Sequence, residues 1–157
     1  MDEPLGTSRT AEEYIKILER MLILFDSNGR ELPRRELEKI IAQLRAGGPL
    51  SILKSFYGII AGKDSVFEGS LSSTAIPTAL PQAVKDDKEM NWLRADLAER
   101  MCHEGLGSRF IRDDGITRAL WAGDQAKAER LQKVSFKRTK PTLLKKCRDL
   151  LGFGAQQ

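Results

Sequence analysis

Residues 10–25, with the sequence TAEEYIKILERMLILF, carry the clearest fold signal in the chain. Thr10 and Glu13 have the spacing of a capping box, in which each side chain bonds the backbone N–H of the other at a helix start. The large apolar residues that follow recur at helical spacing, namely Tyr14, Leu18, Met21, Leu22 and Phe25. We therefore predict an amphipathic helix that begins at Thr10 and ends at the turn residues 26–29.

Similar helix signals continue on both sides of a weaker connector. Pro33 suits the first turn of a second helix that ends before Gly47, and a third helix is expected between Pro49 and Gly62. Residues 63–81 lose the helical pattern, and their prolines disfavour a long helix. Further helices are expected over 86–103, 114–121, 124–134 and about 139–151. Asp114 and Asp124 are the expected N-caps of the two short ones.

The composition agrees with a helical fold. Hydrophobic residues make up 41% of the chain and aromatic residues only 6%, and long β-branched runs are missing, which disfavours a sheet-based core. The predicted fold class is all-α, with two small helical bundles joined by a linker and packed into one compact unit. The expected divisions are an N-terminal bundle over 1–68, a linker with a short helix over 69–85, and a second bundle over 86–157 with a basic C-terminal end.

We expect no enzyme activity, because no group of residues suggests catalysis or metal binding. The chain has neither a phosphate-binding glycine loop nor a zinc-protease motif. The carboxylate pairs Asp86-Asp87 and Asp113-Asp114 are interpreted as residues near helix N-termini, where negative charge is stabilising. His103 is the single histidine. We retain a pH-sensor role for it, because an unperturbed histidine titrates near pH ~6.5. No cofactor, metal or small-molecule substrate is expected.

Positive charge gathers towards the C-terminal end. The formal net charge is +4, yet residues 123–157 hold nine Lys and Arg against three Asp and Glu. Such a basic end favours an anionic partner, either RNA or a membrane surface, and a solvated helix face is the alternative interpretation. The candidate phosphate-binding residues are Lys133, Lys137, Arg138, Lys140, Lys145, Lys146 and Arg148.

Membrane contact, if it occurs, is expected to be peripheral. The longest apolar run in the sequence is Met21 to Phe25. A helix needs about 20 apolar residues to span a bilayer, so no transmembrane segment is predicted.

Two segments resemble the N-terminal domain of orthomyxovirus matrix proteins. The first is residues 36–45, ELEKIIAQLR, followed by Leu50-Ser51-Ile52-Leu53. The second has a matching order and spacing of Asp87, Lys88, Arg94, Glu99, His103 and Gly115. The matched segments cover a minor part of the chain at low identity, and the divergence is more typical of the thogotovirus type than of the influenza type.

The resemblance implies a viral matrix structural protein that self-assembles under the envelope. Its implied partners are further copies of itself, an anionic membrane surface and the viral ribonucleoprotein or RNA. Its implied locations are the virion beneath the envelope, the host cytoplasm and nucleus, and the inner face of the plasma membrane. An RNA- or nucleocapsid-binding helical module and a helical protein–protein adaptor remain open as alternatives.

The sequence departs from the family in its basic motif. The influenza-type motif aligns with residues 94–98, where only Arg94 is basic. The Cys/His cluster proposed to bind zinc in that family is not reproduced either. We therefore expect phosphate contacts to have moved to the region from Lys133 to Arg148.

Overall fold

The computed structural model describes residues 9–61 and 70–136, and this part of the chain is entirely helical. The elements are α1 (Arg9–Ser27), α2 (Glu31–Arg45), α3 (Ile52–Ala61), the 3₁₀ helix η1 (Leu71–Thr74), α4 (Leu80–His103), α5 (Arg109–Trp121) and α6 (Gln125–Gln132). The all-α prediction is confirmed for these residues. The helix expected over 139–151 lies outside them.

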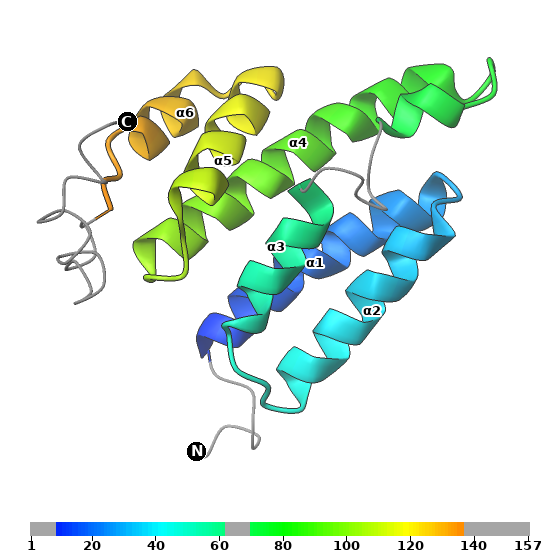
Figure 1. Cartoon of the computed structure of the whole chain (residues 1–157). Coiled ribbons are helices and arrows are strands. Elements are labelled where there is room, and N and C mark those ends of the chain that lie inside the picture. Colours follow the sequence, from blue (N-terminus) through cyan, green and yellow to red (C-terminus); the bar gives the residue numbers. More distant parts are fainter. Residues whose placement is uncertain (1–8, 62–69, 137–157) are drawn as a thin grey trace, which may run out of the picture.

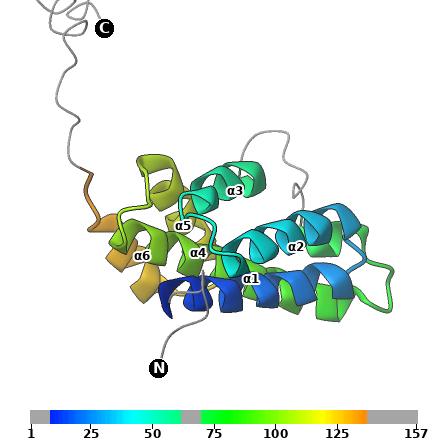
Figure 2. The ribbon, with the colours of Figure 1, turned by 90° about the horizontal axis from the view of Figure 1, so that it is seen from below.

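The apolar stripe of residues 10–25 is buried as predicted. Tyr14, Leu18 and Met21 are almost completely inaccessible to solvent, and Leu22 is partly buried against the same core. The helix begins at Arg9, so Thr10 lies inside the first turn and not at the cap position. A short turn at 28–30 then returns the chain, and α1 and α2 lie side by side (Figures 1 and 2).

One apolar core joins the two predicted bundles. Side chains from α1, α2, α3, η1, α4 and α5 belong to a single buried cluster. Phe56 and Tyr57 of α3 and Leu97 and Met101 of α4 are among its fully buried members. The long helix α4 carries α5 and α6 on its C-terminal half (Figure 1). The division into domains at 68 and 86 stays a prediction, because the shared core neither requires nor excludes it.

Helix α4 begins at Leu80, six residues before the predicted start. Pro81 occupies the first turn, where its missing N–H removes no helical hydrogen bond. The prediction for Asp86 and Asp87 was therefore wrong, because both lie inside the helix. Asp86 accepts hydrogen bonds from Asn28 (2.9 Å) and from Gln82 (2.9 Å).

Asp87 caps a different helix from the one that carries it. Its carboxylate accepts the backbone N–H groups of Leu71 (2.5 Å) and Ser72 (3.1 Å), which start η1. The free N–H groups of a helix start can thus be satisfied by a residue distant in sequence. Asp87 thereby fixes the segment before α4 against α4 itself.

Helix α5 also begins earlier than predicted. Ser108 is its N-cap, and the Ser108 hydroxyl accepts the Ile111 N–H (3.2 Å). Asp114 therefore lies in the second turn and caps nothing, which corrects the prediction for it. The other predicted cap is confirmed, since the Asp124 carboxylate accepts the Lys127 N–H (3.0 Å) at the start of α6.

Small side chains let α4 and α5 approach closely. A Cβ added at Gly115 of α5 would lie 2.6 Å from the Ala98 Cβ of α4 and 3.1 Å from a Leu131 methyl group. Both distances are shorter than ordinary van der Waals contact. Gly115 is therefore needed for the contact between these helices and not for a special backbone conformation.

We predict that Gly115→Ala destabilises the fold by about 1–3 kcal/mol, because the new methyl group overpacks the α4–α5 contact. Gly58→Ala is the matched control, since a Cβ at this position of α3 meets nothing within 4 Å. Gly58→Ala should stabilise by about 0.5–1 kcal/mol through helix propensity. Urea denaturation of both variants checks this, and equal stabilisation by both would contradict it.

Candidate functional site

Of the predicted phosphate-binding residues, the structure describes only Lys133. Lys133 is the exposed C-cap of α6 and forms no ion pair with the other described residues. Lys137, Arg138, Lys140, Lys145, Lys146 and Arg148 lie outside the described residues, so their role stays a prediction. In the sequence, residues 137–157 contain six Lys and Arg against one Asp. The formal net charge of this segment is therefore larger than that of the whole chain, which is +4.

The described helices use many of their cationic side chains to contact one another. Arg20 of α1 binds Glu89 of α4 through two hydrogen bonds. Arg45 of α2 pairs with Glu19 of α1. A third pair joins Arg100 of α4 to Glu13 of α1 at 3.0 Å. Arginines already paired with carboxylates attract an external phosphate less, so the helical body offers fewer free cations than its composition suggests.

Lys127 and Arg130 lie in the basic end of the sequence, but both bind to α4. The Lys127 side chain is buried, with its ammonium 2.9 Å from Asp96, 3.4 Å from Glu99 and 4.6 Å from the centre of the Trp92 ring. Arg130 reaches the same Glu99 at 2.9 Å. Burial raises the pKa of Glu99, but its hydrogen bonds and charge interactions with Arg130 and Lys127 outweigh burial and leave it below the ordinary value. Of the described Lys and Arg in this basic end, Lys133 is the one that forms no ion pair with the described residues.

Arg94, the one basic residue left in the influenza-type motif, is a buried structural group. Its guanidinium lies 3.4 Å from the Ile60 carbonyl oxygen and 3.5 Å from the Asp114 carboxylate. The Tyr57 hydroxyl donates to the same carboxylate at 2.5 Å. Burial lowers the pKa of Arg94, and the charge of Asp114 acts in the opposite direction. Arg94 joins α3, α4 and α5 and does not face solvent, so it offers no phosphate contact.

His103 is exposed at the last residue of α4. It takes part in no ion pair among the described residues. Its neighbour Glu104 accepts a hydrogen bond from the buried Tyr14 hydroxyl at 2.8 Å. A pH-sensor role for His103 stays a prediction.

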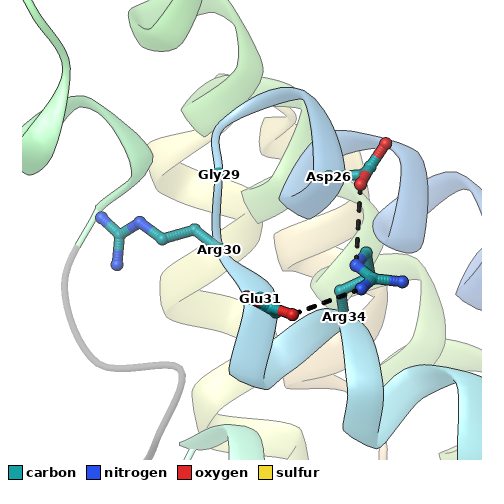
Figure 3. A pocket seen from close by; sticks show the side chains of 5 residues that line it. All are labelled: Asp26, Gly29, Arg30, Glu31 and Arg34. Atoms are coloured by element: carbon teal, nitrogen blue, oxygen red, sulfur yellow. Dashed lines mark ion pairs between the residues drawn. The ribbon is translucent and has the colours of Figure 1, made fainter.

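A pocket of about 200 Å³ at the turn between α1 and α2 is lined by Asp26, Gly29, Arg30, Glu31 and Arg34 (Figure 3). Arg34 lies 3.6 Å from Asp26 and 3.8 Å from Glu31. Arg30 points away from this group and donates to the Ser70 carbonyl oxygen at 2.6 Å. Because the two carboxylates balance the guanidinium that faces them, this pocket is better explained by helix packing than by anion binding.

Sequence analysis missed an exposed face on the N-terminal half of α4. Its members are spaced so that they share one side of the helix, and we call them the α4 ridge: Leu80, Pro81, Val84, Lys85, Lys88 and Trp92. Lys85, Lys88 and Trp92 also line a shallow hollow of about 320 Å³ with Glu89 and Ala122. The spacing was visible in the sequence, but the segment KDDKE at 85–89 contains both lysines and acidic residues, so it did not indicate a positively charged face.

The described residues contain no group of three or more His, Cys, Asp or Glu side chains that could hold a metal ion. Within the same part of the chain, no helix has the length and apolar character needed to cross a membrane. Comparison with protein-family models, curated proteins and solved structures gives no match to this chain.

We predict that Asp114→Ala destabilises the fold by about 3 kcal/mol, because it leaves the buried Arg94 charge and the Tyr57 hydroxyl without their carboxylate partner. Asp113→Ala is the matched control one residue away, since Asp113 is exposed and its one ion pair among the described residues is with Arg112 at 3.0 Å. It should cost about 1 kcal/mol or less. Chemical denaturation compares the two, and similar losses would count against a buried polar network.

Proposed function

We propose that this chain is a matrix-type viral structural protein that assembles into a layer under an envelope and joins an anionic membrane to a ribonucleoprotein. The observation that carries the proposal is the separation of charge along the chain. The helical body pairs many of its arginines with its own carboxylates, whereas residues 137–157 hold an unbalanced excess of five positive charges. The resemblance of two sequence segments to orthomyxovirus matrix proteins supports the same proposal.

The chemistry of the basic end suits phosphates in general. Lys and Arg attract lipid head groups and RNA backbones without reading a base sequence. Phe136 is the aromatic residue beside this cluster, and the Arg112 guanidinium lies 5.6 Å from the centre of its ring. Phe136 is therefore engaged by α5 and is a poor stacking platform for a nucleotide base. Contact with phosphate alone fits a bridging role better than specific RNA recognition.

Exposed apolar side chains on several helices support self-association. Ile23 of α1, Leu32 of α2 and Phe110 of α5 each leave at least half of their surface in water. A mainly apolar groove of about 570 Å³ also lies between α1 and α2, lined by residues that include Leu22 and Ile41. Surface ion pairs contribute only about 0–1 kcal/mol each, so a stable layer needs such apolar contacts in addition to charge.

We predict that the protein self-associates at low salt and that added salt weakens the association, because contacts between exposed charges are screened. Light scattering across protein and salt concentrations measures the effect. A monomer under every condition would overturn the assembly part of the proposal.

We predict that Lys145→Glu with Lys146→Glu reduces binding to anionic vesicles at least about tenfold, since each Lys near such a surface contributes about 1 kcal/mol. Lys16→Glu with Lys54→Glu makes the same change in net charge at exposed lysines of α1 and α3 and serves as the control. Vesicle flotation and RNA binding are measured side by side across salt. If the first pair abolishes RNA binding but leaves flotation intact, the chain is an RNA-binding module instead.

A further inference from the structure

In the segment KDDKE, each acidic side chain has a partner elsewhere in the fold. Asp86 is buried against Asn28, and Asp87 is bound to the backbone of η1. Glu89 is held by two hydrogen bonds from Arg20. Lys85 and Lys88 remain exposed and form no ion pair with the described residues. A segment that is nearly neutral in sequence therefore presents two unbalanced positive charges on the α4 ridge.

Apolar side chains stand on both sides of these lysines. Val84 is 54% exposed and Trp92 is 39% exposed, and Leu80 and Ile76 extend the apolar surface towards the start of the helix at 43% and 66%. Leu80, Val84, Lys88 and Trp92 follow one another at intervals of four residues, so they form a row along the helix. The N-terminal part of α4, where this row begins, extends beyond α5 and α6 (Figure 1), and Lys88 and Trp92 lie beside Ala122 at the turn between those two helices.

Trp92 is held in place at one end of the ridge. Its indole N–H donates to the Asp124 carboxylate at 3.0 Å, and the Lys127 ammonium lies 4.6 Å from the centre of its ring. The Trp92 side chain remains partly exposed and lines the shallow hollow with Lys88 and Ala122. A fixed and partly exposed indole suits a membrane–water interface, where Trp places its apolar ring beside polar groups.

We propose that the α4 ridge is the surface through which this protein enters the interface of an anionic lipid bilayer. This inference rests on the proposed function and adds a second membrane contact to the one proposed for the basic residues of the C-terminal end. The apolar ridge residues Leu80, Val84 and Trp92 insert at the level of the head groups, and Ile76, which precedes α4, inserts beside them. Lys85 and Lys88 extend their ammonium groups to lipid phosphates while their aliphatic stems cover apolar surface.

Two other occupants fit the ridge less well. A second copy meeting the same face by two-fold symmetry would bring Lys85 and Lys88 against their own counterparts, with no free carboxylate on the ridge to balance them. RNA would need an open stacking surface, and the Lys127 ammonium already lies against the Trp92 ring. An anionic bilayer supplies an apolar layer for Val84 and Trp92 and negative phosphates for Lys85 and Lys88.

The test uses the full chain with vesicles of phosphatidylcholine alone or mixed with phosphatidylserine. We expect Lys85→Glu with Lys88→Glu to lower flotation with phosphatidylserine vesicles at least about tenfold relative to Lys16→Glu with Lys54→Glu, which changes the net charge equally. Leu80→Ser with Val84→Ser keeps the charge and should also weaken flotation. Circular dichroism and denaturation midpoints matching the control establish that the variants fold.

The fluorescence of Trp92 gives a second readout, because electrostatic attraction to the vesicle surface without insertion would not move the indole out of water. In a Trp121→Phe background, Trp92 is the remaining tryptophan. Its emission should shift to shorter wavelength when phosphatidylserine vesicles are added, because the indole leaves water. If the Trp121→Phe variant still floats with the vesicles but its emission wavelength does not change, the ridge does not insert and the inference is overturned.

The outcomes separate this inference from the proposed function. If the parent floats and the ridge variants float as well as the control, the α4 ridge is not the membrane surface, while the proposed function stands. If the parent binds neither vesicle type, membrane bridging itself fails. If the ridge variants lose assembly measured by light scattering without vesicles, the ridge binds a second copy of the chain. If they lose RNA binding alone, the ridge binds RNA. Either result would overturn the inference.

Discussion

The close approach of α4 and α5 is the contact on which the remaining structure depends. Ala98 of α4 faces Gly115 of α5 so closely that an added methyl group has no room. This approach brings Asp114 under α3, where it accepts the Tyr57 hydroxyl and pairs with Arg94. A polar link inside an apolar core is stable only when its partners are held in contact, because an unpaired buried charge is costly. Small residues at the α4–α5 contact thus make the buried ion pair tolerable.

The same packing decides which charges face solvent. Lys127 and Lys133 lie six residues apart in one basic region, yet Lys127 is enclosed by Asp96, Glu99 and Trp92 while Lys133 is exposed. On α4, Asp86 and Asp87 serve neighbouring elements, and Lys85 and Lys88 are left outside. The charge available to a partner is therefore a property of helix arrangement and differs from the formal charge of a segment. A bridging function that relies on phosphate contact depends on which lysines and arginines the helix packing leaves exposed.

Sequence patterns predicted helix type well and helix starts less well. The apolar stripe from Tyr14 to Phe25 identified α1 because a 3.6-residue period leaves few alternatives. The starts of α4 and α5 were misplaced because Pro81 and Asp114 are each compatible with more than one position near a helix end. Asp87 shows why, since a carboxylate that looks like a local cap can satisfy the backbone of another helix. The basic composition from Lys133 onward is visible in the sequence alone, whereas the burial of Arg94 and Lys127 is not.

By itself, the amino-acid sequence determined that this protein is helical and that its positive charge accumulates near residue 133 and beyond. Periodicity and composition are local properties, so they can be read without knowing which helices meet. Only the tertiary structure decided that Arg94 is a core residue and that the other described helices leave Lys85, Lys88 and part of Trp92 exposed on α4. These outcomes depend on contacts between segments far apart in the chain, because a side chain faces solvent only where no other helix packs over it.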